Sequence, residues 1–401
     1  PHYDFETTFG NFNYKQGAFD LGGPIDKNGE FLYRIVGLGR LADTQTDLVQ
    51  DNKIFIAPSF TWRPTTDTSF TILSQYQKID NKGYQQYVPG QVAFSGNPLG
   101  RIKRSTYLGE PGADGYTLEQ KAIGYAFEHR FDNSVQFRQN FRYTEATQDL
   151  HSIRPEGMIG NNLVVRSYDY VRASTQNLTL DNQLQADFQT GPVMHKVLGG
   201  FDYTHMKANS EFRMTYAFPT IDAFNPVYGA AIPSWDSIVP SFIKRDDHQS
   251  QAGFYLQDQI KFDRWTLTLS GRQDVVNTAF TSAGIYPMAG NYARSDSAQT
   301  GRVGLNYLFD NGVSPYVTYS TSFTPNLGAD ATGQTFKPTT GDNVEIGVKY
   351  QPVGMNLMLT AALFDTRQQN VLTGNPLNPF FNVQTDSMRV RGFEFEAKAP
   401  K

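Results

Sequence analysis

Apolar and polar side chains alternate along the stretch Leu178-Thr-Leu-Asp-Asn-Gln-Leu-Gln-Ala-Asp-Phe188. Its even-numbered positions are apolar except for Asn182, and its odd-numbered positions are all polar. A helix would scatter these residues around its circumference, whereas a strand sorts them onto two faces. The stretch therefore predicts a β-strand with one apolar and one polar face.

The same alternation recurs along the rest of the chain, at 135–143, 265–272, 344–350, 357–363 and 393–396. Aromatic residues make up 14% of the chain and charged residues only 18%, which suits half-buried strands better than helices. No run of about 18 apolar residues occurs, so a membrane-spanning helix is excluded. A strand of a membrane barrel needs only about 10 residues, with apolar side chains at every second position.

The links between the predicted strands alternate between short and long. The short links fall near 26–30, 64–67, 131–134, 190–195, 262–264, 309–313 and 351–354. The long links fall near 41–52, 79–118, 148–168, 209–248, 279–296, 323–342 and 368–388. If the strands run up and down, all short links lie at one end and all long links at the other. This asymmetry is typical of outer-membrane barrels, which have tight periplasmic turns and long extracellular loops.

Aromatic residues flank the short links, for example at Phe127 and Phe131 or at Phe262 and Trp265. Such rings prefer the headgroup level of a bilayer, so the placement indicates an aromatic girdle at the periplasmic rim. The chain from Tyr3 to Ala397 has room for about sixteen strands. We therefore predict an all-β fold, a transmembrane antiparallel up-and-down β-barrel.

A set of short motifs supports a more specific interpretation. In chain order they are Asp20-Leu-Gly-Gly-Pro-Ile25, Leu108-Gly-Glu-Pro111, Tyr255-Leu-Gln-Asp-Gln-Ile260, Trp265-Thr-Leu-Thr-Leu-Ser-Gly-Arg272, Tyr319-Ser-Thr-Ser-Phe-Thr-Pro325, Pro338-Thr-Thr-Gly-Asp-Asn-Val-Glu-Ile-Gly-Val-Lys349 and Arg391-Gly-Phe-Glu-Phe-Glu396. Together they resemble TonB-dependent siderophore receptors, especially the ferric-hydroxamate (ferrichrome-type) branch. Any one motif is weak, but the ordered set is specific.

The resemblance implies a barrel of about 22 strands around an N-terminal plug domain. On this interpretation, residues 1–401 form a partial barrel domain that lacks the plug, its TonB-contacting segment and about six final strands. We would then expect a fragment that cannot insert or gate transport alone, because both of its sheet edges are unpaired. The full receptor is expected to be a monomer in the outer membrane of a Gram-negative bacterium, importing ferric siderophores with energy supplied through TonB.

A ferric siderophore already satisfies its metal, so the protein needs aromatic walls and a few hydrogen-bond donors rather than iron ligands. We therefore expect ligand contacts from aromatic residues of the long loops. The candidates are Tyr84, Tyr87, Tyr107, Tyr116, Trp235, Phe323, Phe336 and Phe381, with Phe380 beside the last. Each of these rings has an alternative role in packing one loop against another.

Charged residues suggest two further contacts. Arg101, Lys103 and Arg104 form a small basic cluster that could attract an anionic ferric complex or lipopolysaccharide phosphates, or could simply face solvent. The inward-facing arginines Arg138, Arg142 and Arg272 are expected to pair with plug carboxylates or with acids across the lumen, in a structural role.

Other classes of function find little support. The chain has no cysteine, its six histidines form no close ligand pair, and it has no nucleotide-binding or nucleophile-elbow motif. We expect no enzyme activity, no resident cofactor and no metal site, with iron present only as cargo. A net charge of −4 without a basic run argues against nucleic acid as a partner.

Two alternatives remain open at this point. A passive porin for small solutes would need a closed barrel and no plug. A soluble β-rich adhesin or carbohydrate-binding protein would bury its apolar faces in a core and would show no alternation of loop lengths.

Overall fold

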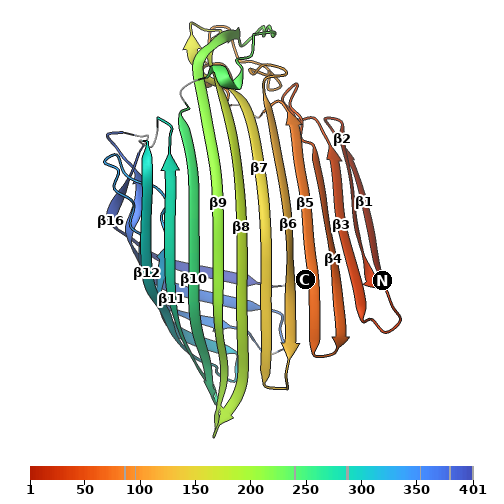
Figure 1. Ribbon diagram of the computed structural model, residues 1–401, viewed down its shortest axis with the longest axis vertical. Coiled ribbons are helices and arrows are strands. Elements are labelled where there is room, and N and C mark those ends of the chain that lie inside the picture. The colour runs from red at the N-terminus through yellow and green to blue at the C-terminus, as the bar shows by residue number, and fades with distance from the viewer. Residues whose placement is uncertain are drawn as a thin grey trace.

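In a computed structural model the chain forms sixteen antiparallel strands in one sheet, and each strand pairs with its neighbours in sequence (Figure 1). The structure describes residues 1–84, 87–94, 96–238, 241–285, 289–352, 354–378 and 381–399. Within these ranges, no helix is both long and apolar enough to cross a membrane. The predicted strand count and antiparallel order are therefore confirmed.

The strands differ in length, and the longest lie in the middle of the chain. They are β1 (His2–Gly10), β2 (Tyr14–Pro24), β3 (Phe31–Leu41), β4 (Lys53–Thr65), β5 (Thr68–Lys82), β6 (Gly115–Arg130), β7 (Val135–Ile159), β8 (Leu163–Thr190), β9 (Val193–Asp222), β10 (Ile243–Phe262), β11 (Trp265–Ser282), β12 (Gly290–Tyr307), β13 (Val313–Thr324), β14 (Thr339–Tyr350), β15 (Met358–Gly374) and β16 (Asn382–Lys398). Two short helices, α1 (Gly90–Ala93) and η1 (Trp235–Ser237), lie in the loops.

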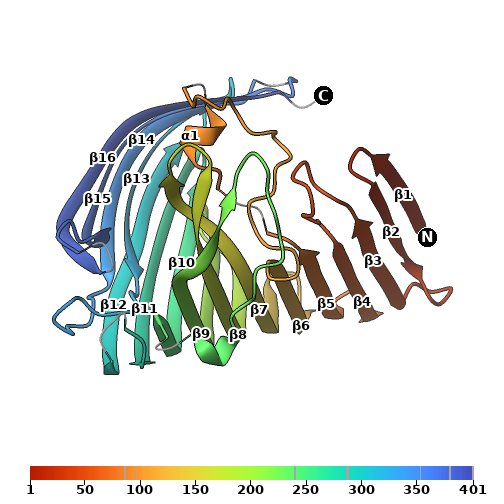
Figure 2. The same ribbon diagram turned by 90° about the horizontal axis from the view of Figure 1, so that it is seen from above.

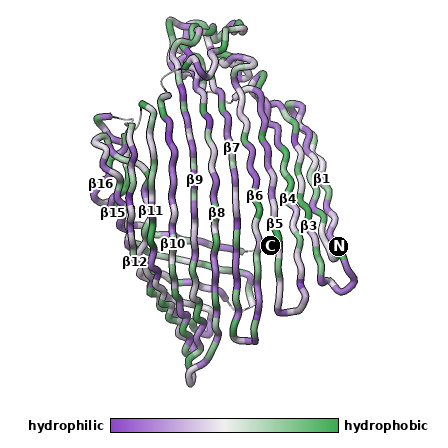
Figure 3. The backbone as a smooth tube through the Cα atoms, viewed as in Figure 1, coloured by the Kyte–Doolittle hydropathy of each residue, from purple (hydrophilic) through white to green (hydrophobic). Residues whose placement is uncertain are grey.

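Seen from above, the sheet curves around a central space, and β1 and β16 form its two edges (Figure 2). We call this curved sheet the wall. Its hydropathy changes from residue to residue along the strands, as alternation requires (Figure 3). Directly paired residues share one face of a sheet. Leu180 pairs with Phe141 and with Tyr203, whereas Asp181 pairs with Asn140 and with Asp202.

We call the side that carries Leu178, Leu180 and Tyr203 the apolar face, and the side that carries Thr179, Asp181 and Asp202 the polar face. Large side chains on the apolar face are exposed, for example Leu256 at 60% and Leu184 at 50%. The wall therefore does not bury this face in a core, contrary to what the soluble alternative requires.

The long links gather at one end of the wall, which we call the loop end, but one predicted link is absent and another is shorter than predicted. Residues 148–168 form no loop, since β7 continues to Ile159 and β8 starts at Leu163. β9 likewise extends to Asp222, well into the predicted link 209–248. These strand ends carry polar residues on both faces, so the apolar alternation disappears from the sequence although the ladder of backbone hydrogen bonds continues.

Two small buried clusters lie at the loop end, where loops cover the extended ends of β7 to β9. The first joins Val92 of α1 and Leu108 to Val164, Ile221 and Ala223. The second joins Ala113, Ile153, Tyr168, Phe218 and Ile238. The described parts of loops 83–114 and 223–242 are thus packed on the strand ends.

Candidate ligand-binding cavity

A cavity of about 280 Å³ lies on the polar face at the loop end, between loop 83–114 and the upper parts of β7 to β9. One row of paired residues, Tyr116, Leu150, Val171 and Phe212, crosses β6 to β9 at this height. Leu150 and Val171 lie eight positions from Arg142 and Thr179 respectively, so strand alternation places them on the polar face. Leu150, Val171 and Phe212 line the cavity, and the loop adds Tyr84 and Tyr87.

Two of the predicted aromatic residues, Tyr84 and Tyr87, line the cavity, and a third, Tyr116, lies beside Tyr84. The rings of Tyr84 and Tyr116 are 6.2 Å apart between centroids, and Tyr87 stands at the rim with 81% of its surface exposed. We had predicted that Tyr116 lies in the loop. It lies on β6 instead, because the strand begins at Gly115. These rings offer flat apolar surfaces with phenolic donors, which is the chemistry expected for a bulky polar ligand.

A charged pair completes the lining. Arg154 of β7 lies 3.3 Å from Asp169 of β8, measured from Nη1 to Oδ2, and its Nε donates to Glu156 at 2.8 Å. Asp169 is buried and also accepts a hydrogen bond from Ser167. The cavity therefore combines aromatic walls with a fixed guanidinium, and nothing in the amino-acid spacing indicated this pair.

Tyr107 is not available to a ligand, because it is buried under the loops with 1% of its surface exposed. Its hydroxyl donates to the carboxylate of Asp114, and its carbonyl accepts from the Tyr228 hydroxyl at 2.9 Å. Burial beside the Asp114 carboxylate raises the pKa of the Tyr107 phenol, so it remains a neutral donor. The packing role that we had weighed for loop aromatics fits this residue.

A buried ion pair holds the same two loops, and it was not foreseen from the sequence. Arg166, with 1% of its surface exposed, donates to the carbonyls of Gly109 at 2.8 Å and Pro219 at 2.7 Å. It also contacts the Glu110 carboxylate at 3.4 Å, and Glu110 accepts a hydrogen bond from the amide of Gly229 at 2.5 Å. The cavity wall that carries Tyr84 and Tyr87 is therefore anchored to loop 223–242.

Trp235 lies away from the cavity. Its ring is stacked between the guanidinium groups of Arg172 and Arg213, at 4.5 Å and 4.1 Å from the ring centroid. Arg172 is six positions from Leu178 on β8, so it belongs to the apolar face. Trp235 and its contacts therefore lie on the side of the wall opposite to the cavity, so the geometry does not bring this residue to the candidate ligand site as we had expected.

The remaining candidates are also separate from the cavity. Phe323 lies on β13, on the same face as Val317 and Tyr319, and thus on the apolar face rather than in a loop. Phe336 and Phe381 are buried within their own loops, with 5% and 8% of their surfaces exposed. Phe380 lies outside the described residues.

The three arginines that were predicted to face inward make different contacts. Arg272 forms ion pairs within the wall, with Asp202 of β9 and at 2.6 Å with Asp274 of β11. Arg138 and Arg142 contact glutamine side chains instead, Gln185 and Gln75. In the part of the chain that the structure describes, no group of three histidine or acidic side chains could hold a metal.

The sequence matches the family model described as TonB dependent receptor-like, beta-barrel, over residues 58–400. The chain belongs to this family. Its barrels lie in the outer membrane of Gram-negative bacteria, and the predicted family, fold and location are confirmed. Because the apolar face of a membrane barrel meets lipid, the polar face and its cavity line the interior.

Two relatives are named receptors or transporters, as the family leads one to expect, rather than enzymes. The chain is 35% identical over 393 residues to the ferrioxamine B receptor of Salmonella typhimurium, covering 97% of this chain and 54% of that protein. It is 32% identical over 410 residues to the ferrichrome outer membrane transporter/phage receptor of Escherichia coli, covering 96% and 54%. The chain thus spans about half the length of these relatives.

Solved structures share the fold. The ferripyoverdine receptor of Pseudomonas aeruginosa matches with a TM-score of 0.81 at 19% identity, over 100% of this chain and 54% of that one. The ferric-catecholate import receptor Fiu of E. coli, in its closed form, matches with a TM-score of 0.80 at 19% identity, over 99% and 62%. Identities this low establish the architecture and not the ligand.

Proposed function

We propose that the full-length protein is an outer-membrane receptor that binds ferric siderophores at the loop end and imports them with energy supplied through TonB. The observation that carries the proposal is the interior-facing cavity, which is lined by Tyr84, Tyr87 and the Arg154–Asp169 pair. A ferric siderophore presents a bulky, polar and already coordinated metal complex, which aromatic walls and a few donors can hold. Iron is cargo on this view and not a cofactor.

The names of the relatives support a hydroxamate-type ligand. Receptors named for ferrioxamine and ferrichrome are 32–35% identical to this chain. A passive porin, our earlier alternative, is not favoured, because the family is one of receptors. We further propose that a plug domain transmits TonB's action, that the apolar face contacts outer-membrane lipid, and that the receptor works as a monomer.

Uptake can be tested in a receptor-deleted strain that carries the full-length gene and grows under iron starvation on a panel of ferric siderophores. We expect rescue by at least one ferric hydroxamate, and no rescue when TonB is also deleted. Growth that is independent of TonB, together with free permeation of sugars, would instead favour the porin.

The cavity can be tested by direct binding of the rescuing siderophore to the purified receptor. We expect the double variant Tyr84→Ala/Tyr87→Ala to bind about tenfold or more weakly, since removal of an aromatic anchor at a binding hot spot costs about 2 kcal/mol or more. The matched control is Phe94→Ala, a similarly exposed aromatic residue of the same loop (73% against 81% for Tyr87) that does not line the cavity. Wild-type affinity in the double variant would place the ligand elsewhere.

A further inference from the structure

The charged end of the interior cavity holds more negative than positive charge. Two carboxylates, those of Glu156 and Asp169, lie against one guanidinium, that of Arg154, at 2.8 Å and 3.3 Å. One positive and two negative groups leave this cluster with a formal charge of −1. The cluster therefore has one carboxylate more than its own cation can neutralise.

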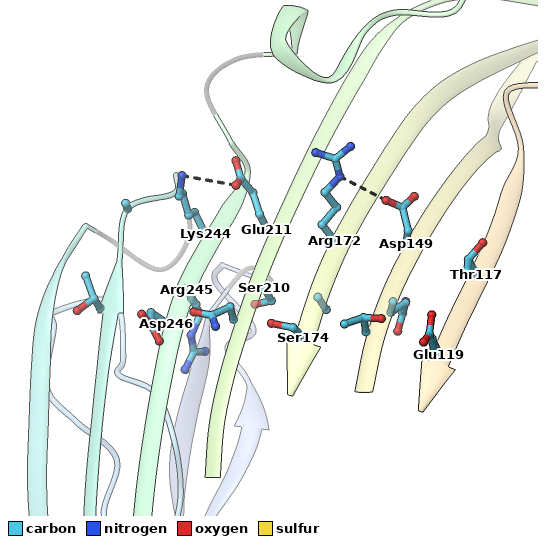
Figure 4. A pocket seen from close by; sticks show the side chains of 16 residues that line it. Thr117, Glu119, Asp149, Arg172, Ser174, Ser210, Glu211, Lys244, Arg245 and Asp246 are labelled. Carbon is cyan, nitrogen blue, oxygen red and sulfur yellow. Dashed lines mark hydrogen bonds and ion pairs between the residues drawn. The ribbon is translucent and has the colours of Figure 1, made fainter. Parts of the chain in front are cut away.

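The outward face of the same strands is balanced differently. There Asp149 and Glu211 each have a cation of their own, since Arg172 contacts Asp149 at 3.3 Å and Lys244 contacts Glu211 at 3.5 Å (Figure 4). Arg172 is also directly paired with both Asp149 and Glu211 across the sheet, so the charges alternate. The excess of negative charge is thus particular to the end of the cavity and is not a general property of the upper strands.

Asp169 is the carboxylate that a ligand in the cavity can reach. It lines the cavity although only 7% of its surface is exposed. Its Oδ2 atom faces Arg154, whereas its Oδ1 atom lies 3.4 Å from the Ser167 hydroxyl, which is a long hydrogen bond. The single hydroxyl proton of Ser167 has a closer acceptor in Glu156, at 2.7 Å. A nine-tenths buried carboxylate oxygen therefore has room for a stronger donor.

The rest of the lining is apolar and suits a chain of methylene groups. Leu150, Val171 and Phe212 form the floor, and Asp169 lies two positions along β8 from Val171, about 7 Å beyond it. Tyr84 adds an aromatic face from the loop. The volume of about 280 Å³ is at the lower limit of the roughly 300–1,000 Å³ of pockets that enclose a whole ligand. The cavity therefore fits one arm of a bulky complex and not all of it.

We infer that the cavity is a subsite for a methylene arm that ends in an ammonium group, and that Asp169 selects this arm. The inference rests on the proposed function, because the arm belongs to the ferric complex. The ammonium group donates a charge-assisted hydrogen bond to Oδ1 of Asp169 and brings the charge of the cluster to zero. The rings of Tyr84 and Tyr87 offer further faces to the cation. A neutral arm leaves Asp169 as it is, and a carboxylate-ended arm adds a second excess negative charge.

The test compares two probes on the purified full-length receptor: a linear ferric trihydroxamate with a free terminal amine, protonated at pH 7, and the same complex after N-acetylation. We expect the ammonium form to bind about tenfold more tightly, as one charge-assisted hydrogen bond allows. Asp169→Asn should bring its affinity down to that of the acetylated form. The affinity of the acetylated form should stay the same in this variant, which shows that the site is still folded.

The matched control is Asp202→Asn, which removes a carboxylate from the same face of the wall. Asp202 pairs with Arg272 and does not line the cavity, so this variant should keep the preference for the ammonium form. Equal affinity of the wild type for the two complexes would overturn the inference and leave the proposed function intact. A preference that survives in Asp169→Asn would also overturn it, by placing the arm elsewhere. Failure of every ferric complex to bind would instead contradict the proposed function, and the inference with it.

Discussion

Close packing around single glycines explains how charged side chains are held on the polar face of the wall. A Cβ atom added to Gly253 would lie 1.9 Å from Nη2 of Arg272 and 2.9 Å from Oδ1 of Asp274. The guanidinium therefore occupies the space that a side chain at this position would take, and there it reaches both Asp202 and Asp274. Replacing Gly253 should therefore separate Arg272 from its two carboxylate partners, at a site away from both buried clusters of the loop end.

We expect Gly253→Ala to lower the free energy of unfolding by about 1–3 kcal/mol, because Arg272 loses its position while Asp274 stays buried. The matched control is Gly271→Ala on the neighbouring strand, where an added Cβ meets nothing within 4 Å. Denaturant titration in detergent micelles measures both variants. Equal stability of the two would show that Arg272 moves aside at no cost.

Single residues also mark the limit of prediction from sequence. The alternation places Arg272 on the polar side, and that much was expected, but its partners come from the register between β9, β10 and β11. The burial of Arg166 and Glu110 could not be foreseen, since charged residues are rarely buried and their positions lie 56 apart in the chain. Trp235 was misplaced because loop composition does not say over which face a loop folds.

At the scale of elements, the tall hairpin of β7 and β8 is the feature that builds the cavity. Its upper part supplies Arg154 and Asp169, and it also carries Arg166, which anchors the loops. Sequence alternation identified only the lower parts of these strands, because lipid imposes an apolar face only within the membrane. Above the membrane both faces meet water or loops, so the alternation of apolar and polar side chains no longer indicates a strand.

Because only the lower part of the hairpin lies in the membrane, we predict that its tip can be removed without loss of the barrel. Ile153 and Tyr168 are directly paired, so residues 154–167 can be replaced by an Asn-Gly turn. We expect the shortened receptor to assemble in the outer membrane and to lose measurable siderophore binding, because Arg154 and the anchor of loop 83–114 are gone.

The matched control for the shortened hairpin puts Asn-Gly in place of residues 191–192, the turn between β8 and β9 at the other end of the wall. This variant should bind as the wild type does. Assembly is followed by the mobility shift of the heated and unheated protein on gels. Failure of the shortened form to assemble, with normal assembly of the control, would show that the tip directs folding as well as binding.

For the whole molecule, the sheet order and the asymmetry of its ends were predictable, because a sheet that faces lipid on one side repeats the same alternation of apolar and polar side chains in every strand. The packing of the loops was not, since it depends on contacts between residues far apart in the sequence, such as Tyr228 with Tyr107. The cavity lies where these two kinds of structure meet, which is why only part of its lining could be named beforehand.

Two adjacent residues of β8 test the orientation of the entire wall. Leu180 lies on the apolar face among Phe141 and Tyr203, whereas Thr179 lies on the polar face beside Arg142. A lysine facing the middle of the bilayer costs about 2–4 kcal/mol, and one facing a wet interior costs little. We therefore expect Leu180→Lys to lower the free energy of unfolding in lipid vesicles by about that amount, while Thr179→Lys changes it by less than about 1 kcal/mol. Since the two positions share strand, depth and local hydrogen bonding, only the direction of the side chain separates them. Equal costs, or a larger cost at Thr179, would contradict a wall that faces lipid with its apolar side, and would remove the physical basis for placing the cavity inside.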